Sequence, residues 1–536
     1  MLKQWIPAAK PDKEELDKRL DVAQEELLRL QMQIKEHKLP VLVLIEGWGA
    51  AGKGSTIGGI IKNIDPRFFK VASMSAPTEE EKRKPFLYRY FVKIPEAGKF
   101  EFLDSGWMDE VTKGRLRGEL SDKQYAERIE SIKRFERQLT DNGYLVLKLF
   151  FQIGKKEQKK RLEELEGNKD TAWRVGENDW WQNKHYDKCE EVFDKYLTDT
   201  NASVAPWYII DSGDKKWAEL QVLETLCSGI HVVMQNESLA VPILQNVFPL
   251  VKMPKLSEVE LDKEISEEEY KKELRHLQKK LNALHYRLYR KKIPVVIAYE
   301  GWDAAGKGGN IKRIAGALDP RGYEVHPIAS PEPHEKARHY LWRFWTRLPK
   351  TGHIAIFDRT WYGRVMVERI EGFASTQRWQ DAYDEINEME ATLIEDGYIL
   401  LKFLLIIDKE EQLKRFKDRE NTPEKHYKIT DEDWRNHDKF DDYVEAMNDM
   451  IVRTSTSVAP WVVMPSMDKR YARVHVLEHF IDAARKAFEK RGIDIDVPRA
   501  IEEIEKKDLK AEDKSEKPKS DKTKAKDNKP KEEQKG

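Results

Sequence analysis

The chain carries one sequence unit twice, and this repeat constrains the fold more than any other feature. The segment Val43–Gly54 recurs as Ile297–Gly308, displaced by 254 positions. The same displacement carries Ser203–Trp207 onto Ser457–Trp461, and no insertion or deletion is needed in between. Self-similarity over such a span is typical of a duplicated structural unit. We therefore predict a tandem duplication of a domain of roughly 230 residues.

The repeat divides the chain into four parts. The two copies are predicted at 1–240 and 263–495, and the segment 241–262, with Pro242, Pro249 and Pro254, is predicted to be the linker between them. The remaining residues, 496–536, are rich in Lys, Glu and Asp and have almost no apolar side chains. Such a segment cannot bury enough apolar surface to offset the entropy of ordering, so we predict that it is disordered.

Both copies alternate predicted strands with predicted helices. Helical spacing of apolar residues predicts a charged helix over 266–291, and long helices over 376–396 and 409–419. Apolar runs predict five strands, at 295–299, 323–329, 353–357, 398–407 and 461–464. This alternation predicts an α/β fold in which each copy is a parallel sheet flanked by helices.

The segment Glu300–Gly309 has the layout of a phosphate-binding loop. It follows the apolar run Val295–Tyr299 and leads into a helical pattern. Glycines allow successive N–H groups to face phosphate oxygens, and Lys307 supplies a mobile positive charge. Gly308 stands where a Ser or Thr normally holds magnesium, and Asp303 is the replacement ligand that the loop offers. The alternative is a tight structural turn. The backbone groups predicted to bind phosphate are those of Gly301, Ala304, Ala305, Gly306, Gly308 and Gly309.

A second motif runs from Phe357 to Arg364. Asp358 ends a predicted strand, and phosphate-handling sheets place magnesium ligands at that edge. Asp303 and Asp358 together would meet the need of magnesium for one or two carboxylates. Arg359 and Arg364 are then available for the transferring phosphoryl group. A helix cap is the alternative role for Asp358, and an exposed ion pair is the alternative for Glu368.

A third candidate is the charged segment that carries Arg415, Arg419 and Lys425. A cationic helix between the fourth and fifth strands is where small-molecule kinases carry a lid over the phosphates. Taken alone, the segment is equally typical of a solvated helix face.

The first copy keeps the residues on which the fold depends but lacks many charged residues of the second copy. We interpret this loss as the loss of catalysis in the first copy, which retains Lys53 and Asp104 and with them some capacity for phosphate. The changed residues are predicted to surround one loop. They are Asp303, Lys312, Arg313, Arg359, Arg364, Glu368, Arg378, Arg419 and Lys425, replaced by Gly49, Gly58, Gly59, Ser105, Glu110, Gly114, Gln124, Leu165 and Thr171.

Composition narrows the class of protein. The formal net charge of −1, with 36% charged residues, gives no bulk attraction for nucleic acid. Two cysteines, Cys189 and Cys227, cannot form a disulfide framework. The sequence has no signal peptide and no run of about 20 apolar residues, so we expect a cytoplasmic protein without a membrane partner.

With these motifs assembled, the second copy resembles the polyphosphate kinase 2 family of P-loop kinases. The matching residues are Gly301–Gly308, Phe357–Arg364, Glu368 and Ser457–Trp461. The fused pair resembles the two-domain, class II members, the polyphosphate:AMP phosphotransferases, which make ADP from AMP. Many relatives carry asparagine where this chain has Gly363. That difference weakens the transfer of any substrate contact made there.

The resemblance implies Mg²⁺-dependent transfer from inorganic polyphosphate to AMP or another nucleoside monophosphate, on a P-loop kinase fold with a helical lid. The same site leaves open an ATP-dependent nucleotide kinase, a polyphosphate-driven nucleoside diphosphate kinase and a non-catalytic polyphosphate-binding scaffold. A homo-oligomer is also left open. By resemblance, Lys307 binds phosphate, and Asp303 and Asp358 position magnesium and the acceptor. Arg359, Arg364, Arg415 and Arg419 steady the transferred group, Glu368 supports the site, and Lys312, Arg313, Arg343 and Lys425 line the polyanion channel.

Overall fold

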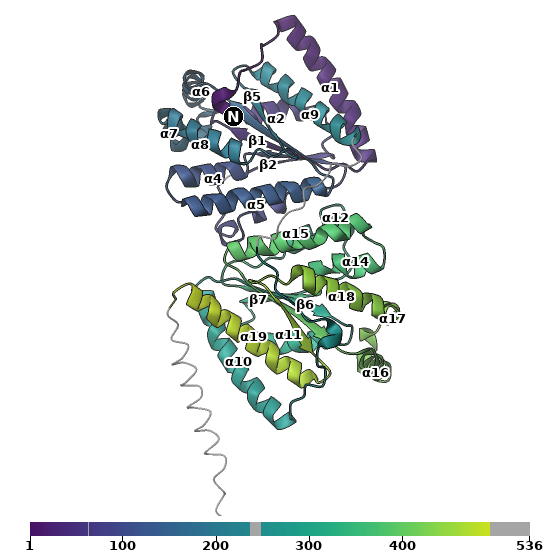
Figure 1. Ribbon diagram of the computed structural model, residues 1–536. Coiled ribbons are helices and arrows are strands. Elements are labelled where there is room, and N and C mark those ends of the chain that lie inside the picture. Colours follow the sequence, from purple (N-terminus) through teal and green to yellow (C-terminus); the bar gives the residue numbers. More distant parts are fainter. Residues whose placement is uncertain (63, 75, 236–247, 494–536) are drawn as a thin grey trace, which may run out of the picture.

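The computed structural model describes residues 1–62, 64–74, 76–235 and 248–493. They form two lobes, each built on a five-stranded sheet (Figure 1). The predicted disordered tail at 496–536 and the first part of the predicted linker, 241–247, lie outside the described residues. Among the helices that the structure describes, none has the length and apolar character needed to cross a membrane.

The first lobe contains one copy of the repeat. Short 3₁₀ turns lie at Leu2–Gln4, Glu81–Arg83 and Ala172–Arg174. The elements are α1 (Lys13–Glu36), β1 (Val41–Gly47), α2 (Lys53–Ile61), β2 (Phe69–Ser73), α3 (Tyr88–Phe91), β3 (Phe100–Asp104), α4 (Trp107–Leu116), α5 (Asp122–Asp141), β4 (Leu145–Gln152), α6 (Lys155–Gly167), α7 (Glu177–Lys184), α8 (Tyr186–Asp199), β5 (Trp207–Asp211) and α9 (Lys215–Gln235).

The second lobe repeats this order. A 3₁₀ turn, η4 (Leu256–Glu258), precedes it in the described part of the linker. The elements are α10 (Glu267–Arg290), β6 (Val295–Gly301), α11 (Lys307–Ala315), β7 (Tyr323–Pro327), α12 (Pro333–Lys336), α13 (Trp342–Trp345), β8 (Ile354–Asp358), η5 (Trp361–Val365), α14 (Val367–Ile370), α15 (Thr376–Glu395), β9 (Ile399–Ile406), α16 (Lys409–Glu420), η6 (Pro423–Lys428), α17 (Asp431–Asp438), α18 (Phe440–Thr454), β10 (Trp461–Pro465) and α19 (Lys469–Lys490).

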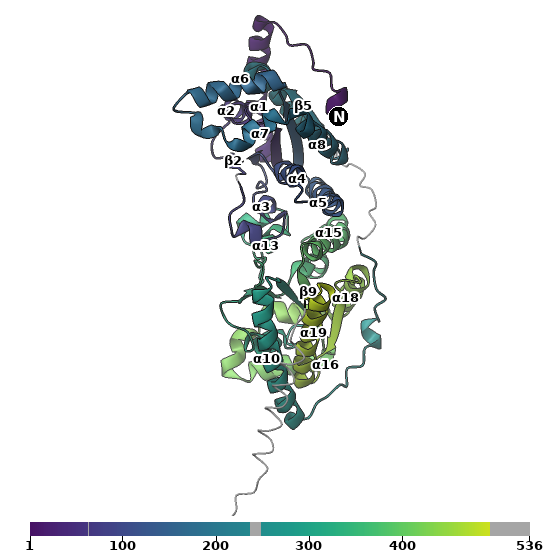
Figure 2. The same ribbon diagram turned by 90° about the vertical axis from the view of Figure 1, so that its left-hand side faces the viewer.

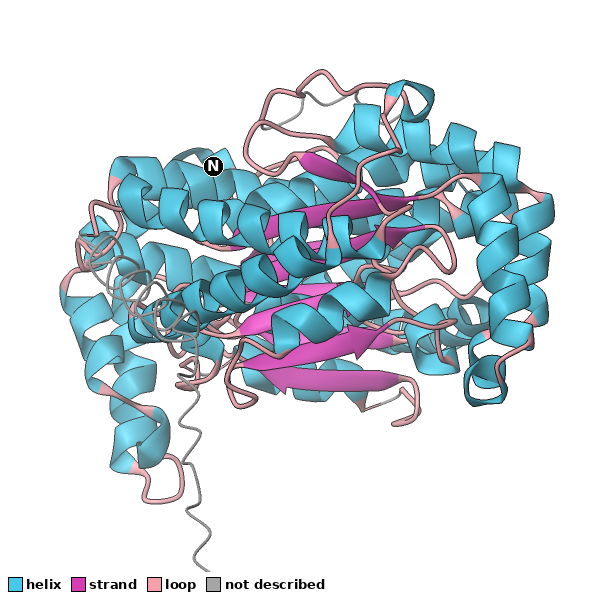
Figure 3. Cartoon of the chain, turned by 90° about the horizontal axis from the view of Figure 1, so that it is seen from below, coloured by secondary structure: helices cyan, strands magenta, loops and turns pink. Residues whose placement is uncertain are grey.

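Both sheets have the same strand order, which confirms the predicted duplication. The order is β2-β3-β1-β4-β5 in the first copy and β7-β8-β6-β9-β10 in the second, and every pair is parallel. Helices cover both faces, so the strands are enclosed (Figure 3). The chain leaves β6 in one direction toward β7 and β8 and later returns to β9 on the other side. The carboxyl ends of β6 and β8 therefore flank the crevice where such sheets bind ligands.

The cores of the two copies share a buried ion pair. Every residue of β9 is buried, including Lys402, whose ammonium group lies 2.7 Å from Glu390. The equivalent Lys148 and Glu136 are also 2.7 Å apart. Burial raises the pKa of Glu136 and lowers the pKa of Lys402 and Lys148, and in each pair the partner's charge opposes this effect. Because both copies keep the pair, it belongs to the fold rather than to a site of one copy.

The two lobes meet through equivalent elements. Helices α5 and α15 lie side by side in both views (Figures 1 and 2). Phe91 and Trp345 occupy equivalent positions and stack on each other, with ring centroids 4.9 Å apart. Two backbone hydrogen bonds repeat the relationship: Thr351 donates to Arg83 at 2.7 Å, and Ala97 donates to Ala337 at 2.8 Å. The copies are therefore related by a local pseudo-two-fold axis.

Candidate active site

The loop between β6 and α11 has a backbone that only small residues allow. Gly301 has φ +125°, and a Cβ there would lie 2.1 Å from the carbonyl oxygen of Leu405 on β9. Gly306, at φ +109°, precedes the first turn of α11. Ala304 between them is also left-handed, at φ +64°. The loop thus wraps the N-terminus of α11, where free N–H groups and the helix dipole favour an anion.

Lys307 is the first residue of α11 and folds over the loop. Its ammonium group donates to the carbonyl oxygens of Gly301 at 2.6 Å and Trp302 at 3.1 Å. The indole of Trp302 stacks on Phe440 at 3.8 Å and is buried, so it packs in the core and is no ligand platform. The lysine therefore lies at the mouth of the loop, where the outer phosphates of a ligand would stand.

Arg415 of α16 braces the loop from outside. Its guanidinium donates to the carbonyl oxygens of Ala304 at 3.0 Å, Ser466 at 2.7 Å and Met467 at 2.8 Å, and to Glu411 at 2.6 Å. It is buried, and these bonds engage all three of its nitrogens. Arg415 therefore holds the loop backbone, and its contact with the transferred group stays a prediction. The equivalent Arg161 makes the same set of contacts in the first copy.

Asp303 and Arg359 form the charged pair at the mouth of the loop. Arg359 donates to Asp303 Oδ1 at 3.1 Å, and Asn436 of α17 donates to Oδ2 at 2.9 Å. Burial acts to raise the pKa of Asp303, but the charges of Lys307 and Arg359 outweigh it and hold the pKa below its usual value. Arg359 also approaches Glu432 at 3.5 Å. Asp303 is thus an ionised group beside two cations.

Asp358 is the last residue of β8 and pairs in register with Tyr299 of β6. Its side chain is half-buried, and within the described residues its carboxylate accepts no hydrogen bond. A magnesium ion would take one or two carboxylates together with phosphate oxygens and water. The described residues hold no group of three or more His, Cys, Asp or Glu side chains suited to a metal. Asp358, with Asp303 beside the loop, fits the smaller set that magnesium needs.

Gly308 leaves space where a hydroxyl side chain would stand. A Cβ at this position would meet no heavy atom within 4 Å. The absence of Ser or Thr is therefore not imposed by packing.

Glu300 supports the second motif from below, a role that the sequence did not reveal. Its Oε1 accepts from the backbone N–H of Thr360 at 2.7 Å and from the Thr360 hydroxyl at 2.6 Å. Burial raises the pKa of Glu300, while the hydrogen bonds from Thr360 and the charge of Lys307 act in the opposite direction. Glu300 thereby fixes the turn that presents Arg359, which has a left-handed backbone at φ +66°.

Arg364 of η5 and Glu368 of α14 form an ion pair at 2.8 Å. The guanidinium of Arg364 also lies over the ring of Tyr340, 4.3 Å from its centroid. Arg343 of α13 pairs with Glu335 at 3.3 Å. The equivalent Arg89 and Glu81 also face each other, at 3.9 Å, so this pair is common to both copies.

Of the remaining predicted residues, four lie on α11, α16 and η6, and one lies at the junction between the copies. Lys312 is exposed on α11, and Arg313 donates to the carbonyl oxygen of Gly309 at 3.2 Å. Arg419 lies on α16 and Lys425 in η6, and the Lys425 side chain falls outside the described residues. Arg378, which the comparison of the copies placed around the loop, lies instead at the junction, where it donates to the carbonyl oxygen of Asp141. Its replacement by Gln124 therefore reflects the junction and not the loop.

Two cations of α19, Lys469 and Arg473, lie over the loop and were not predicted from the sequence. A Cβ at Gly309 would lie 3.1 Å from Arg473 Nη2, and one at Gly306 would lie 3.7 Å from Lys469 Cγ. Within the described residues, Arg473 Nε is buried without a hydrogen-bond partner. Desolvation and the nearby charges of Arg415, Arg473 and Arg419 lower the pKa of Lys469 to about 8. Arg473 is equivalent to Glu219, and this charge reversal is the signal that could have revealed it.

The equivalent loop of the first copy is filled by the protein's own side chains. Gln182 accepts from the backbone N–H of Gly49 at 2.9 Å. A Cβ at Gly49 would lie 2.3 Å from Asp179 Oδ1, so this space has no room for a carboxylate such as Asp303. Lys53 still donates to Gly47 at 3.3 Å and to Trp48 at 3.1 Å. The first copy thus keeps the loop but lacks the charged pair and carries an amide side chain on it.

The comparisons with known proteins agree with this geometry. The family described as Polyphosphate kinase 2 (PPK2) matches residues 10–238 and again residues 264–492. A polyphosphate:AMP phosphotransferase from Pseudomonas aeruginosa is 39% identical over 486 residues, covering 89% of this chain and 97% of the relative. One from Pseudomonas syringae is 40% identical over 468 residues, covering 87% and 94%. A crystal structure described as that of a putative polyphosphate kinase 2 from Pseudomonas aeruginosa PA01 superimposes with a TM-score of 0.79 at 37% identity, covering 92% of this chain and 100% of that one.

Proposed function

The chain belongs to the polyphosphate kinase 2 family of phosphotransferases, and we propose that it transfers the terminal phosphoryl group of inorganic polyphosphate to AMP, giving ADP. In this reaction the terminal P–O–P bridge breaks. A phosphate oxygen of AMP forms the new P–O bond, and the shortened polyphosphate leaves with the bridging oxygen. The similarity supports the proposal over nearly the whole length of relatives that bear the name polyphosphate:AMP phosphotransferase.

The second copy is the proposed site of the reaction. The observation that carries this assignment is the Asp303–Arg359 pair at the loop mouth, at 3.1 Å, which the first copy lacks. There the equivalent residues are Gly49 and Ser105, and Gln182 occupies a loop N–H. Phosphoryl transfer depends on positioning and charge neutralisation more than on a protein nucleophile. A copy that has lost its charged pair has lost those means.

Each group of the second copy has a part in this proposal. The loop N–H groups and Lys307 bind the phosphates, and Arg359 neutralises charge on the group in transit. Arg364 is a second cation for the transferred group, and Glu368, 2.8 Å from it, supports the site. Lys312, Arg313, Lys469 and Arg473 receive the polyanion, which makes donor binding sensitive to salt through counterion release. Arg415 acts through the loop and is a positioning residue.

Magnesium would be held by Asp358 and Asp303. When bound, it would neutralise charge on the phosphate oxygens between the two substrates. Asp303 is ionised because Lys307 and Arg359 lower its pKa, and Asp358 has a carboxylate free of hydrogen bonds among the described residues. An ionised carboxylate at Asp303 and a carboxylate without hydrogen bonds at Asp358 both suit the binding of a hard cation.

The direct test is ADP formation from AMP, polyphosphate and magnesium without ATP. The proposal predicts ADP that depends on polyphosphate, and none when polyphosphate is replaced by inorganic phosphate. Parallel reactions with ATP as donor, or with ADP and GMP as acceptors, separate the other kinase activities. Absence of ADP from AMP and polyphosphate would refute the proposal.

A further inference from the structure

The junction between the copies is symmetric in its backbone and asymmetric in its charges. The paired hydrogen bonds from Thr351 to Arg83 and from Ala97 to Ala337 repeat each other across the pseudo-two-fold axis. Two identical copies would repeat their side-chain contacts in the same way, because an isologous interface pairs each contact with its mirror. The side chains of this chain do not follow that rule.

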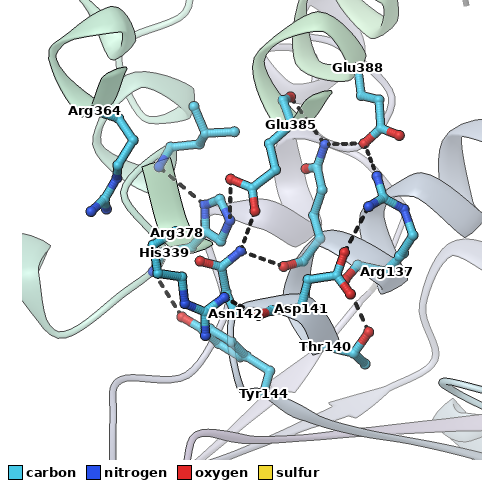
Figure 4. A network of polar contacts seen from close by, with 12 residues as sticks. Arg137, Thr140, Asp141, Asn142, Tyr144, His339, Arg364, Arg378, Glu385 and Glu388 are labelled. Atoms are coloured by element: carbon cyan, nitrogen blue, oxygen red, sulfur yellow. Dashed lines mark hydrogen bonds and ion pairs between the residues drawn. The ribbon is translucent and has the colours of Figure 1, made fainter. Parts of the chain in front are cut away.

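In the three ion pairs between α5 and the end of α15, the cation comes from the first copy and the carboxylate from the second. A fourth pair across the junction has the opposite polarity, since Arg338 of the second copy lies 2.7 Å from Glu96 of the first. Arg128 pairs with Asp396 at 2.6 Å, and Arg134 pairs with Glu395 at 3.1 Å. Figure 4 shows the third pair, in which Arg137 donates to Glu388.

The carboxylates of the second copy are buried and depend on these partners. The exposed fractions of the side chains are 7% for Asp396, 9% for Glu388 and 16% for Glu395. Glu385 is buried beside them and accepts a hydrogen bond from Asn142 of the first copy at 2.6 Å (Figure 4). Buried carboxylates without a cation or donor strongly destabilise an interface.

A second copy in the place of the first would remove every one of these partners. The residue equivalent to Arg134 is Glu388, so Glu395 would face a like charge. Ala382 would replace Arg128 and Ala391 would replace Arg137. Asp396 would replace Asn142 and would stand against Glu385. Homotypic pairing of the second copy is thus opposed by repulsion between these carboxylates.

We propose that this surface is a heterotypic pairing surface: α15 of the second copy fits α5 of the first copy and rejects a second copy of itself. The charge-depleted first copy is then retained as the specific partner of the charged second copy. The duplicated chain closes on itself and offers no self-complementary face for assembly through this surface.

A short series of contacts connects the junction between the copies to the candidate site. Tyr144 of the first copy accepts a hydrogen bond from the backbone N–H of His339 at 2.9 Å. The next residue, Tyr340, carries Arg364 over its ring. The first copy therefore helps to position Arg364, although it holds none of the charged groups at the loop.

The test uses the full chain with a protease site inserted within 236–247. After cleavage, native mass spectrometry and size-exclusion chromatography measure which fragments stay together. The proposal predicts one 1:1 complex of the two fragments with the mass of the uncut chain. Glu395→Arg should raise the dissociation constant of the fragments about 10-fold or more, and adding Arg134→Glu should recover most of the loss. Arg29→Glu, a matched charge reversal on exposed α1 outside the junction, should change nothing.

The readout is association and does not require enzymatic activity, so it is separate from the test of the proposed function. The proposal would be overturned by pairs of two C-terminal fragments. It would also be overturned if Glu395→Arg left association unchanged, or if the double reversal did not recover it. Circular dichroism of the uncut variants monitors folding, and a single variant that unfolds while the double reversal folds and pairs counts in favour of the proposal.

Discussion

Arg359 donates to Asp303 at 3.1 Å in the second copy, and both residues are replaced in the first, where Ser105 and Gly49 stand. The backbone around them is unchanged. Arg359 and Ser105 have φ values of +66° and +65°, and Ala304 and Ala50 have +64° and +58°. The left-handed geometry of the loop and turn therefore survives without the charged pair. The two copies therefore share the shape of the loop and differ in the charges that phosphoryl transfer requires.

The first prediction concerns this pair. Arg359→Ser, which copies the residue of the first repeat, should lower kcat by about 10²-fold to 10³-fold, because it removes a cation from the group in transit. Steady-state kinetics with AMP and polyphosphate measure the effect. The matched control, Ser105→Arg, should leave kcat unchanged. A decrease of less than about threefold for Arg359→Ser would contradict the role given to Arg359.

The second prediction concerns pH. Lys469 has a pKa lowered to about 8, so its ammonium group is charged below that pH and loses its charge as the pH rises through it. Loss of a cation beside the loop weakens anion binding, so kcat/KM for polyphosphate should fall above a pH of about 8. Lys469→Arg keeps the charge and should move this decrease to higher pH. An unchanged alkaline limb in that variant would exclude Lys469 as its source.

The third prediction concerns the donor path. Arg473→Glu, the residue of the first copy at this position, should raise KM for polyphosphate about 10-fold or more, with a much smaller effect on KM for AMP. It should also reduce the steepness with which added salt raises KM for polyphosphate. Glu219→Gln in the first copy is the control and should leave both KM values as they are. Equal changes in the two KM values for Arg473→Glu would argue for a general disturbance of the loop.

Much of this fold follows from local sequence. The predicted strand at 398–407 is observed at Ile399–Ile406, and the predicted helix at 376–396 is observed at Thr376–Glu395, ending before Gly397. The long apolar runs and the glycine stop carry these signals within a few residues. The repeat then extends each assignment to the other copy, which explains why the architecture could be predicted from the sequence.

The site was harder to predict from the sequence, because its residues come together only in three dimensions. Lys469 and Arg473 lie more than a hundred residues beyond the loop that they cover. Arg415 reads as a free cation on a charged helix, and only its partners show that backbone carbonyls occupy it. Arg378 is lost in the first copy for a reason that belongs to the junction. A substitution between repeats marks a difference of environment, and the structure is needed to say which one.

The fourth prediction separates bracing from chemistry. Arg415→Ala should destabilise the second copy by about 3 kcal/mol, since it leaves three carbonyl oxygens without their charged donor. Its kcat should fall as the loop loosens. Arg161→Ala removes the equivalent brace in the first copy and should cause a similar loss of stability with little change in kcat. Thermal unfolding and kinetics of both variants are the measurement. Full stability of Arg415→Ala would contradict the bracing role.

The assignment of catalysis to the second copy is tested by comparing Asp358→Asn with Asp104→Asn, the same change at equivalent strand ends of the two copies. Both variants are made in the full chain and assayed for ADP formation from AMP, polyphosphate and magnesium. Asp358→Asn should abolish activity, and Asp104→Asn should retain nearly all of it. Comparable losses from the two variants would contradict the assignment of catalysis to the second copy.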